Sequence, residues 1–200
     1  MGKNGDLYEL NIVQSMPEKG DLLVSAPLLN DGVFEHSVVL MADKGRDDSD
    51  MGFVLNQKSI YTLDDVFDKR EILFKVPVYC GGPVGLNKLF YVHTLGELFT
   101  DTIQIADGLY MNGNLDEILE YVNAGYPVEG CMRFFIGYSG WSPEQLEREI
   151  GEESWAVVKP ENGYGRLLNG YGTKYWRSLL NDLDDRFMKW KSIPNFPDFN

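Results

Sequence analysis

The sequence has little cysteine and little histidine, and these shortages exclude several classes of protein. Two cysteines, Cys80 and Cys131, are too few for the disulfide framework of a small secreted domain. Together with the two histidines, His36 and His93, they show no spacing that is typical of a zinc site. We therefore expect buried free thiols, no bound metal and no cofactor.

Long apolar runs and a recognisable leader are also missing. The first twenty residues contain no apolar stretch that ends in a small-residue cleavage site. No later run reaches the roughly eighteen consecutive apolar residues that are needed to cross a bilayer. The expected location is the cytoplasm, without association with a membrane.

Positive charge is scarce as well. The chain has 31 Asp and Glu against 18 Lys and Arg, which gives a formal net charge of −13. Phosphate backbones would be repelled overall, so a nucleic-acid partner is disfavoured. A modest local excess of cations remains between Thr173 and Lys191, and it leaves DNA binding open as an alternative.

Apolar material is ample. Hydrophobic residues make up 44% of the chain and aromatic residues 13%, which is enough to build a core and offset the entropy of ordering the chain. We find no internal repeat and no linker that marks a boundary. The sequence is therefore expected to form a single domain over residues 1–200.

Apolar runs and turn residues predict a mixture of strands and helices. Thr62 and Asn114 are expected to cap helices through Phe67 and up to Gly125, whereas the acidic run 43–50 has no apolar anchor and is expected to be a solvated loop. The expected strands cover residues 22–26, 37–41, 52–56, 76–80, 89–93, 102–105, 133–138 and 155–158.

The C-terminal part of the sequence predicts a long amphipathic helix at about residues 173–190. Its large apolar residues fall at offsets of 3, 4, 7, 11 and 14 from the first of them, which places them in one stripe: Trp176, Leu179, Leu180, Leu183, Phe187 and Trp190. This stripe should dock on the body of the domain or on a partner. The stretch from Pro194 to Pro197 is expected to be an irregular tail.

The segment Gly137–Trp141 resembles the nucleophile turn of a hydrolase, but its spacing is wrong. That turn requires glycine two residues after the serine, where this chain has Trp141, and a histidine downstream of Ser139. We therefore expect Ser139 to be structural and to hold the strand-to-helix turn. The helix that follows should be capped by Ser142, with proline in its first turn.

Two polar residues leave alternatives open. His36 precedes an apolar run and could be a general base or a structural group; the structural interpretation is favoured because no nucleophile is fixed near it. Arg133 enters a strongly apolar strand, where its charge must be paired. It is either a structural arginine, which is favoured, or an anion-binding residue.

Several segments resemble, in order along the chain, the motifs of the bacterial AlgH/YqgE proteins. These segments are Gly20–Pro27, Phe34–Leu40, Gly52–Asn56, Gly81–Val84, Gly137–Trp141, Gln145–Glu147 and Ser154–Trp155. The chain departs from the usual pattern at Ser142 and Glu144, where glycines are common, and in its long C-terminal helix. These departures keep us from transferring a partner from other members.

The resemblance implies an α+β fold, with a bifurcated, partly barrel-like mixed β-sheet flanked by helices. It also implies a protein without established catalytic activity, although some members carry the label of transcriptional regulator. The first hypothesis is therefore a non-enzymatic regulatory or protein-interaction domain with an unidentified protein partner and an open oligomeric state. The alternatives are a DNA-binding regulator and an enzyme with a cleft near His36.

No residue is expected to be catalytic. The candidate ligand or partner site comprises His36, Asn56, Gly81, Gly82, Arg133, Tyr138 and Ser139.

Overall fold

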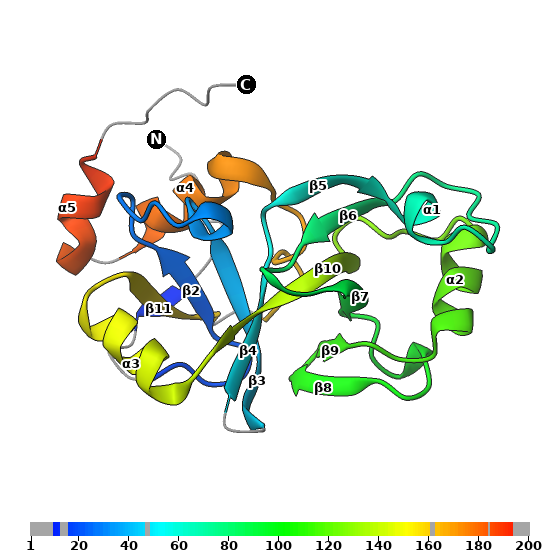
Figure 1. The fold of residues 1–200 in the computed structure, drawn as a ribbon, viewed down its shortest axis with the longest axis horizontal. Helices are drawn as coiled ribbons and strands as arrows, with labels where there is room; N and C mark the ends of the chain where they lie inside the picture. The colour runs from blue at the N-terminus through cyan, green and yellow to red at the C-terminus, as the bar shows by residue number, and fades with distance from the viewer. Residues whose placement is uncertain (1–9, 13–15, 47–48, 161–162, 184, 194–200) are drawn as a thin grey trace, which may run out of the picture.

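The chain folds around one large, bifurcated β-sheet with short helices on its faces (Figure 1). The computed structural model describes residues 10–12, 16–46, 49–160, 163–183 and 185–193. Eleven strands follow the order β1-β11-β2-β3-β4-β10-β7-β9-β8, with β6 pairing β10 and β5 pairing β6. Within the described residues the ends of this order do not pair with each other, so the sheet is open. The expected α+β fold is confirmed.

The sheet has two parts that share one strand. We call the first part sheet A; it consists of β1 (Leu10–Ile12), β11 (Trp155–Pro160), β2 (Leu22–Ser25), β3 (Val38–Arg46), β4 (Ser49–Val54) and β10 (Met132–Trp141). Sheet B consists of β5 (Lys58–Thr62), β6 (Pro77–Cys80), β10, β7 (Val84–His93), β9 (Leu109–Met111) and β8 (Ile103–Ala106).

Strand β10 passes from sheet B to sheet A at Gly137. Residues 132–136 and, beyond the bulge, Tyr138 pair with β7, and residues 139–141 pair with β4. The register shifts between Ile136 and Tyr138, and Gly137 between them has a φ of 71°, a conformation that favours glycine. The bifurcation of the sheet is therefore a β-bulge built on one glycine.

Sheet A is covered on both faces. In β2 the side chains of Leu22 and Val24 point towards the C-terminal helices, and the side chain of Leu23 points towards α3 (Pro143–Gly151). Because both faces are buried, the strand reads as a continuous apolar run rather than an alternating one. The C-terminal helices are α4 (Gly172–Asp182) and α5 (Met188–Lys191), which are joined through the short η3 (Asp185–Phe187).

Sheet B packs on α1 (Leu63–Val66) and α2 (Leu115–Asn123) through a second core cluster. Two further single-turn helices, η1 (Gly32–Phe34) and η2 (Gly96–Leu98), lie in connections. Both helices begin at the predicted residues: the Asn114 side chain accepts from two N–H groups of α2, and at the start of α1 the Asp65 carboxylate accepts from the backbone N–H and the hydroxyl of Thr62. Local sequence chemistry thus fixes where these helices begin.

The expected solvated loop over residues 43–50 is wrong. Strand β3 continues to Arg46 and β4 begins at Ser49, so most of this acidic run forms a hairpin, with residues 47–48 outside the described residues. The Asp50 carboxylate is buried and accepts from the backbone N–H of Gly45 at 3.0 Å. The register shifts twice along this hairpin, between Met41 and Asp43 and between Asp43 and Arg46. Such irregular pairing leaves backbone N–H groups that a carboxylate can accept from, as Asp50 does.

The single helix expected over residues 173–190 is also wrong in part. Helix α4 ends at Asp182, and Leu183 has an extended ψ of 155° before the chain turns into η3 and α5. The apolar stripe nevertheless docks on the body of the domain, since Leu183 and Trp190 are both buried in the core with Trp176. The break lets α5 fold back onto that core. The expected tail at Pro194–Pro197 lies outside the described residues.

Strand bounds depart from the prediction where apolar pattern is weak. The prediction has no counterpart for β1, β5 and β9, and β7 begins at Val84 instead of Leu89. Strand β10 runs to Trp141, so Ser139 lies inside a strand and not in the predicted turn. The cap itself is confirmed, because the Ser142 hydroxyl accepts from the N–H of Gln145 at 3.2 Å.

Candidate functional site

Asn56 joins three segments that are far apart in the sequence. Its amide nitrogen donates to the carbonyl oxygens of His36, at 2.8 Å, and Gly172, at 3.1 Å. Its Oδ1 accepts from the backbone N–H of Val38 at 2.8 Å. Because the buried amide is engaged by backbone on both of its sides, the geometry favours a structural role for Asn56.

Arg133 makes a similar junction from the neighbouring strand. Its side chain is buried, lies 4.1 Å from the centre of the Tyr79 ring and donates to the carbonyl oxygen of Gly170 at 3.0 Å. It also donates to the carbonyl oxygens of Leu55 and Leu168. The guanidinium therefore fastens the segment before α4 to the end of β4, which favours the structural interpretation.

A second junction is formed where Gly81 and Gly82 cross β10. The Ser139 hydroxyl donates to the carbonyl oxygen of Gly81 at 3.0 Å. A methyl group on Gly81 would overlap the carbonyl oxygen of Gly137, and one on Gly82 would overlap the backbone of Tyr138. These glycines permit the close approach of two backbones at the bifurcation, and Ser139 binds a distant carbonyl instead of its own turn.

His36 has no nucleophile among its described contacts. Its ring packs on Trp176, with 4.4 Å between ring centres, and its Nδ1 lies 3.9 Å from the carboxylate of Glu35. The Ser139 hydroxyl donates to the Gly81 carbonyl in the other junction, so these contacts do not join a serine to a histidine. The seven candidate residues thus divide into two structural junctions rather than one reactive cleft.

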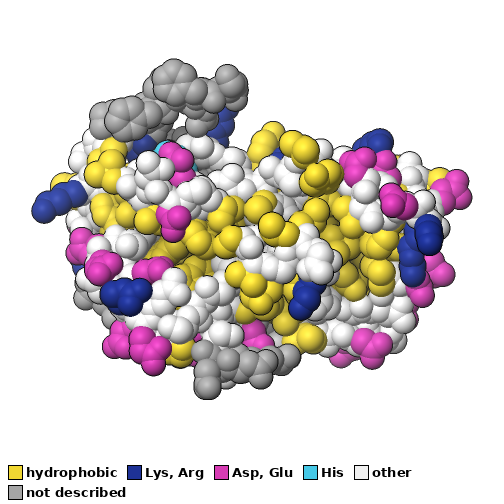
Figure 2. Space-filling model, viewed as in Figure 1, with side chains coloured by type: hydrophobic (Ala, Val, Ile, Leu, Met, Phe, Trp, Pro, Cys, Tyr) yellow, Lys and Arg dark blue, Asp and Glu magenta, His cyan; other side chains and the backbone are white. Residues whose placement is uncertain are grey.

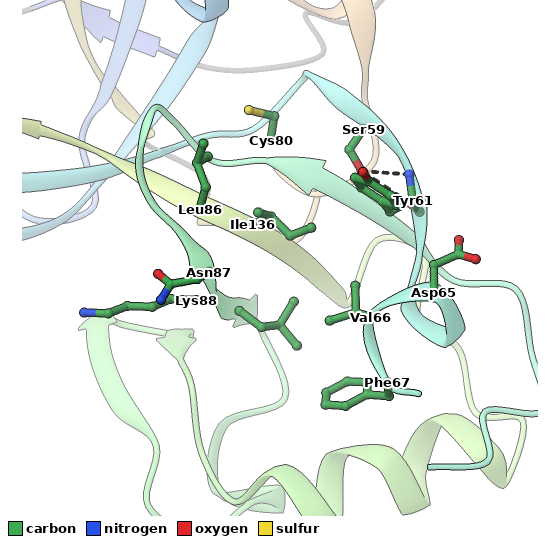
Figure 3. Close-up of a pocket in the computed structure, with 11 residues that line it drawn as sticks. Ser59, Tyr61, Asp65, Val66, Phe67, Cys80, Leu86, Asn87, Lys88 and Ile136 are labelled. Carbon is green, nitrogen blue, oxygen red and sulfur yellow. Dashed lines mark hydrogen bonds between the residues drawn. The ribbon is translucent and has the colours of Figure 1, made fainter. Parts of the chain in front are cut away.

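Sheet B carries an apolar groove that sequence reasoning missed. It has a volume of about 720 Å³ and lies between α1 and the first half of β7, with Ile136 at its base (Figure 3). We call it the apolar groove; its lining residues are Ser59, Tyr61, Asp65, Val66, Phe67, Cys80, Leu86, Asn87, Lys88, Leu89 and Ile136.

Two of the large hydrophobic side chains that line the apolar groove are exposed. Leu86 is 61% exposed and Tyr61 is 48% exposed, and both line the groove. Figure 2 shows hydrophobic side chains gathered on this face, over the half of the molecule that holds sheet B. No sequence signal marks these residues, because an exposed Ile and a buried Ile look alike until their neighbours are known.

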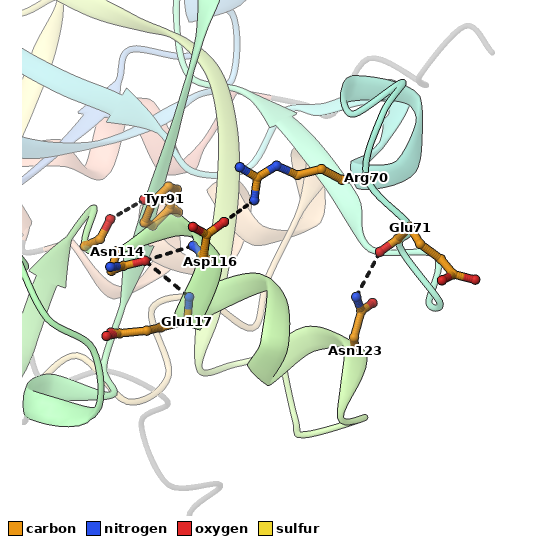
Figure 4. Close-up of polar contacts among 8 residues, drawn as sticks. Arg70, Glu71, Tyr91, Asn114, Asp116, Glu117 and Asn123 are labelled. Atoms are coloured by element: carbon orange, nitrogen blue, oxygen red, sulfur yellow. Dashed lines mark hydrogen bonds and ion pairs between the residues drawn. The ribbon is translucent and has the colours of Figure 1, made fainter.

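The wall of the apolar groove is held by α2. Asn123 on this helix donates to the carbonyl oxygen of Glu71 at 2.9 Å, and Arg70 forms an ion pair with Asp116 at the start of the helix (Figure 4). The segment after Phe67 is therefore tied at two points to a helix that is packed on sheet B.

The described residues contain no group of three or more His, Cys, Asp or Glu that could hold a metal ion. Cys80 and Cys131 are free thiols that are half-buried, so the expected full burial is not observed. Among the helices in the described part of the chain, none is both long and apolar enough to span a bilayer.

His93 is a buried histidine at the far end of β7. Its Nε2 lies 3.0 Å from the carbonyl oxygen of Asn112, whereas its Nδ1 has no hydrogen-bond partner in the described part of the chain. Burial lowers the pKa of His93 below its ordinary value of 6.5, and the bond to Asn112 opposes this shift. The imidazole is therefore neutral in the folded protein near neutral pH.

Acidification is expected to destabilise the protein through His93. As the pH falls below about 6.5, His93 becomes protonated in the unfolded chain but stays neutral in the folded chain. The free energy of unfolding therefore declines until the pH reaches the lowered pKa of the folded state. Urea unfolding at a series of pH values from about 7 to about 5 measures this slope. The variant His93→Phe should show a shallower slope over that range, and equal slopes would contradict the assignment.

The fold and the site define a class: a mixed α+β domain on a bifurcated open sheet, with an apolar groove and two tightly packed polar junctions. The chain belongs to the AlgH-like family, whose model (DUF179) matches residues 22–187. The expected family is thereby confirmed. The family is uncharacterised, and no specific function follows from membership.

Two relatives from Bacteroides match over their whole length. A UPF0301 protein of Bacteroides thetaiotaomicron is 37% identical over 200 residues, and one of Bacteroides fragilis is 38% identical; each match covers all of both chains. Two solved structures share the fold. Protein DIP2367 of Corynebacterium diphtheriae has a TM-score of 0.67 at 21% identity, covering 90% of this chain and 94% of that one. The AlgH protein of Pseudomonas aeruginosa has a TM-score of 0.65 at 22% identity, covering 98% and 100%.

Proposed function

We propose that this chain is a non-enzymatic protein-interaction domain of the cytoplasm, and that the apolar groove receives a short segment of a partner protein. The proposal rests on the groove itself, which has a volume of about 720 Å³, an apolar lining and the exposed side chains of Leu86 and Tyr61. Exposed apolar surface of this kind is costly in water and is typical of a binding site. A regulatory role would act through that partner.

The partner segment is expected to carry apolar side chains flanked by positive charge. The groove lining includes one acid, Asp65, and one base, Lys88, so it is nearly neutral by itself. The net charge of −13 on the whole chain then decides the preference, because it attracts cations and repels acidic segments during encounter. The exposed Leu86 and Tyr61 favour a peptide over a small ligand, which would leave part of them uncovered.

The alternatives have less support. For DNA binding, the cations near the C-terminus would need to lie along one recognition helix. Helix α4 instead buries Trp176 and Leu179, and Arg177 stacks on Trp176 and donates to the carbonyl oxygen of Ile193. For an enzyme with a cleft near His36, the polar groups are engaged by backbone in two separate junctions.

The variant Leu86→Asp is expected to abolish peptide capture by the groove without unfolding the protein. Short random peptides displayed on phage would be selected on the wild-type chain, and the enriched sequences synthesised. They should carry apolar positions beside Lys or Arg, and Leu86→Asp should weaken their binding at least about tenfold, because it places a charge in the apolar contact. The matched control is Leu98→Asp, since Leu98 is 58% exposed but does not line the groove.

Three results would contradict this proposal. The enriched peptides could bind Leu86→Asp as tightly as the wild type, or they could be acidic. The wild-type chain could also sediment as a dimer that Leu86→Asp dissociates, in which case a second copy occupies the groove. Equal thermal midpoints of the two Leu→Asp variants and the wild type would show that folding is intact.

A further inference from the structure

A second cavity, distinct from the apolar groove, gathers cations in a strongly acidic protein. It has a volume of about 230 Å³ and shares no lining residue with the groove. Its polar lining comprises Lys58, Lys75, Tyr79, Glu129 and Arg133. Three cations therefore line the cavity with one carboxylate, and one of the three, Lys75, is also paired with Asp64, although the chain as a whole carries a charge of −13. We call this site the basic cavity.

Tyr79 provides a hydrogen-bond donor in the basic cavity that no protein group uses. The residue is 5% exposed, and its ring is stacked under the Arg133 guanidinium. No described residue accepts a hydrogen bond from its hydroxyl, in contrast to Tyr91 and Tyr175, whose hydroxyls donate to backbone carbonyls. The hydroxyl oxygen itself is not among the buried atoms that lack a partner, so it can be reached by a ligand or by water.

The two lysines add mobile positive charge to this donor. The Lys58 ammonium lies 3.6 Å from the centre of the Tyr171 ring, and in the described part of the chain it forms no salt bridge. Lys75 is paired with Asp64 on the surface, and its exposed stem leaves it free to turn towards an anion. Both are point charges on flexible chains, and such charges suit a compact anion of high charge density.

The size of the basic cavity limits the ligand. Sites for drug-sized molecules span roughly 300 to 1,000 Å³, so a cavity of 230 Å³ admits one compact group and few further atoms. The repulsion from distant acids is screened over about 8 Å at physiological ionic strength, so the local excess of cations prevails inside the cavity. Burial raises the pKa of Tyr79, which keeps its hydroxyl protonated as a donor.

We propose that the basic cavity binds the phosphoryl group of a small dianionic ligand, held by the Tyr79 hydroxyl and the ammonium groups of Lys58 and Lys75. Arg133, whose side chain is engaged by backbone carbonyls, contributes its charge from below the Tyr79 ring. Glu129 sets a preference for phosphoryl groups that bring no second negative substituent near it. The ligand is free phosphate or a small phosphate monoester.

Calorimetric titration of the full chain at constant ionic strength tests this site, with inorganic phosphate in one arm and glycerol phosphate in the other. The wild type should bind at least one probe saturably. Lys58→Gln and Tyr79→Phe should each weaken that affinity about tenfold or more, because each removes one interaction with a charged ligand. The matched controls, Lys88→Gln and Tyr61→Phe, lie in the apolar groove and should leave it unchanged.

Each outcome decides the proposal. Binding of both probes supports a site for the phosphoryl group alone, and binding of glycerol phosphate only supports a site for a phosphate ester. Absence of saturable binding with either probe, or equal affinity in Lys58→Gln and the wild type, overturns the proposal. Urea midpoints without phosphate check folding, and because Lys58 is exposed its variant decides the result even if Tyr79→Phe fails to fold.

Discussion

Replacing Arg133 with methionine is expected to lower the free energy of unfolding by about 3 to 5 kcal/mol. Methionine fills much of the arginine volume but cannot donate. The carbonyl oxygens of Leu55, Leu168 and Gly170 would then lose their donor while they remain near the protein interior. The stacking on Tyr79 would be weakened in the same step, because the cation is removed from the ring face.

Urea unfolding of Arg133→Met beside Arg70→Met measures this difference. Arg70 is largely exposed and pairs with Asp116 on the surface, so its loss should cost less than about 1 kcal/mol. Arg133→Lys keeps the charge but cannot reach three carbonyls, and it should fall between the two. If Arg133→Met unfolded within about 1 kcal/mol of the wild type, the fastening role would be wrong.

Gly81→Ala is expected to destabilise the protein by about 3 kcal/mol or more, since overpacking against backbone cannot be relieved by turning a side chain. The added methyl group would overlap the carbonyl oxygen of Gly137 and press on Phe135 and Phe53. Relief would require β10 to move at its bulge. That movement would break the bond between the Ser139 hydroxyl and the Gly81 carbonyl.

The matched control for this substitution is Gly151→Ala. Gly151 is the last residue of α3, and a methyl group placed on it meets no atom within 4 Å. Alanine is the better helix former, so this variant should gain up to about 1 kcal/mol. Thermal and urea unfolding of the two variants would give opposite signs. A neutral Gly81→Ala would mean that the two backbones can separate there without cost.

The features that the sequence predicts are those that depend on nearby residues. The cap at Ser142 needs only the N–H of Gln145, three positions later, and the buried strand at Leu22–Ser25 needs only a continuous apolar run. The same local logic fails for the C-terminal stripe. Its spacing is helical throughout, but docking on the core breaks the helix after Asp182.

The candidate site depends on contacts between distant residues, which the sequence could not supply. Arg133 bonds a carbonyl 78 positions away, and the Ser139 hydroxyl bonds one 58 positions away. The residue types alone are informative, because an arginine in an apolar strand must have polar partners. Those partners can be identified only from the fold. The exposure of Leu86 likewise depends on distant parts of the chain, none of which packs over its side chain.

The position of β10 sets the order in which the chain can fold as it is synthesised. The strands of sheet B come from one continuous stretch, from Lys58 to the first half of β10, so they can assemble as soon as that stretch leaves the ribosome. Sheet A forms later, because β4 pairs with the last residues of β10 and β2 pairs with β11, and both partners are synthesised about a hundred residues later. Until Pro160 has emerged, β2 to β4 carry unpaired edges, and this is the interval in which the nascent chain is most exposed to aggregation.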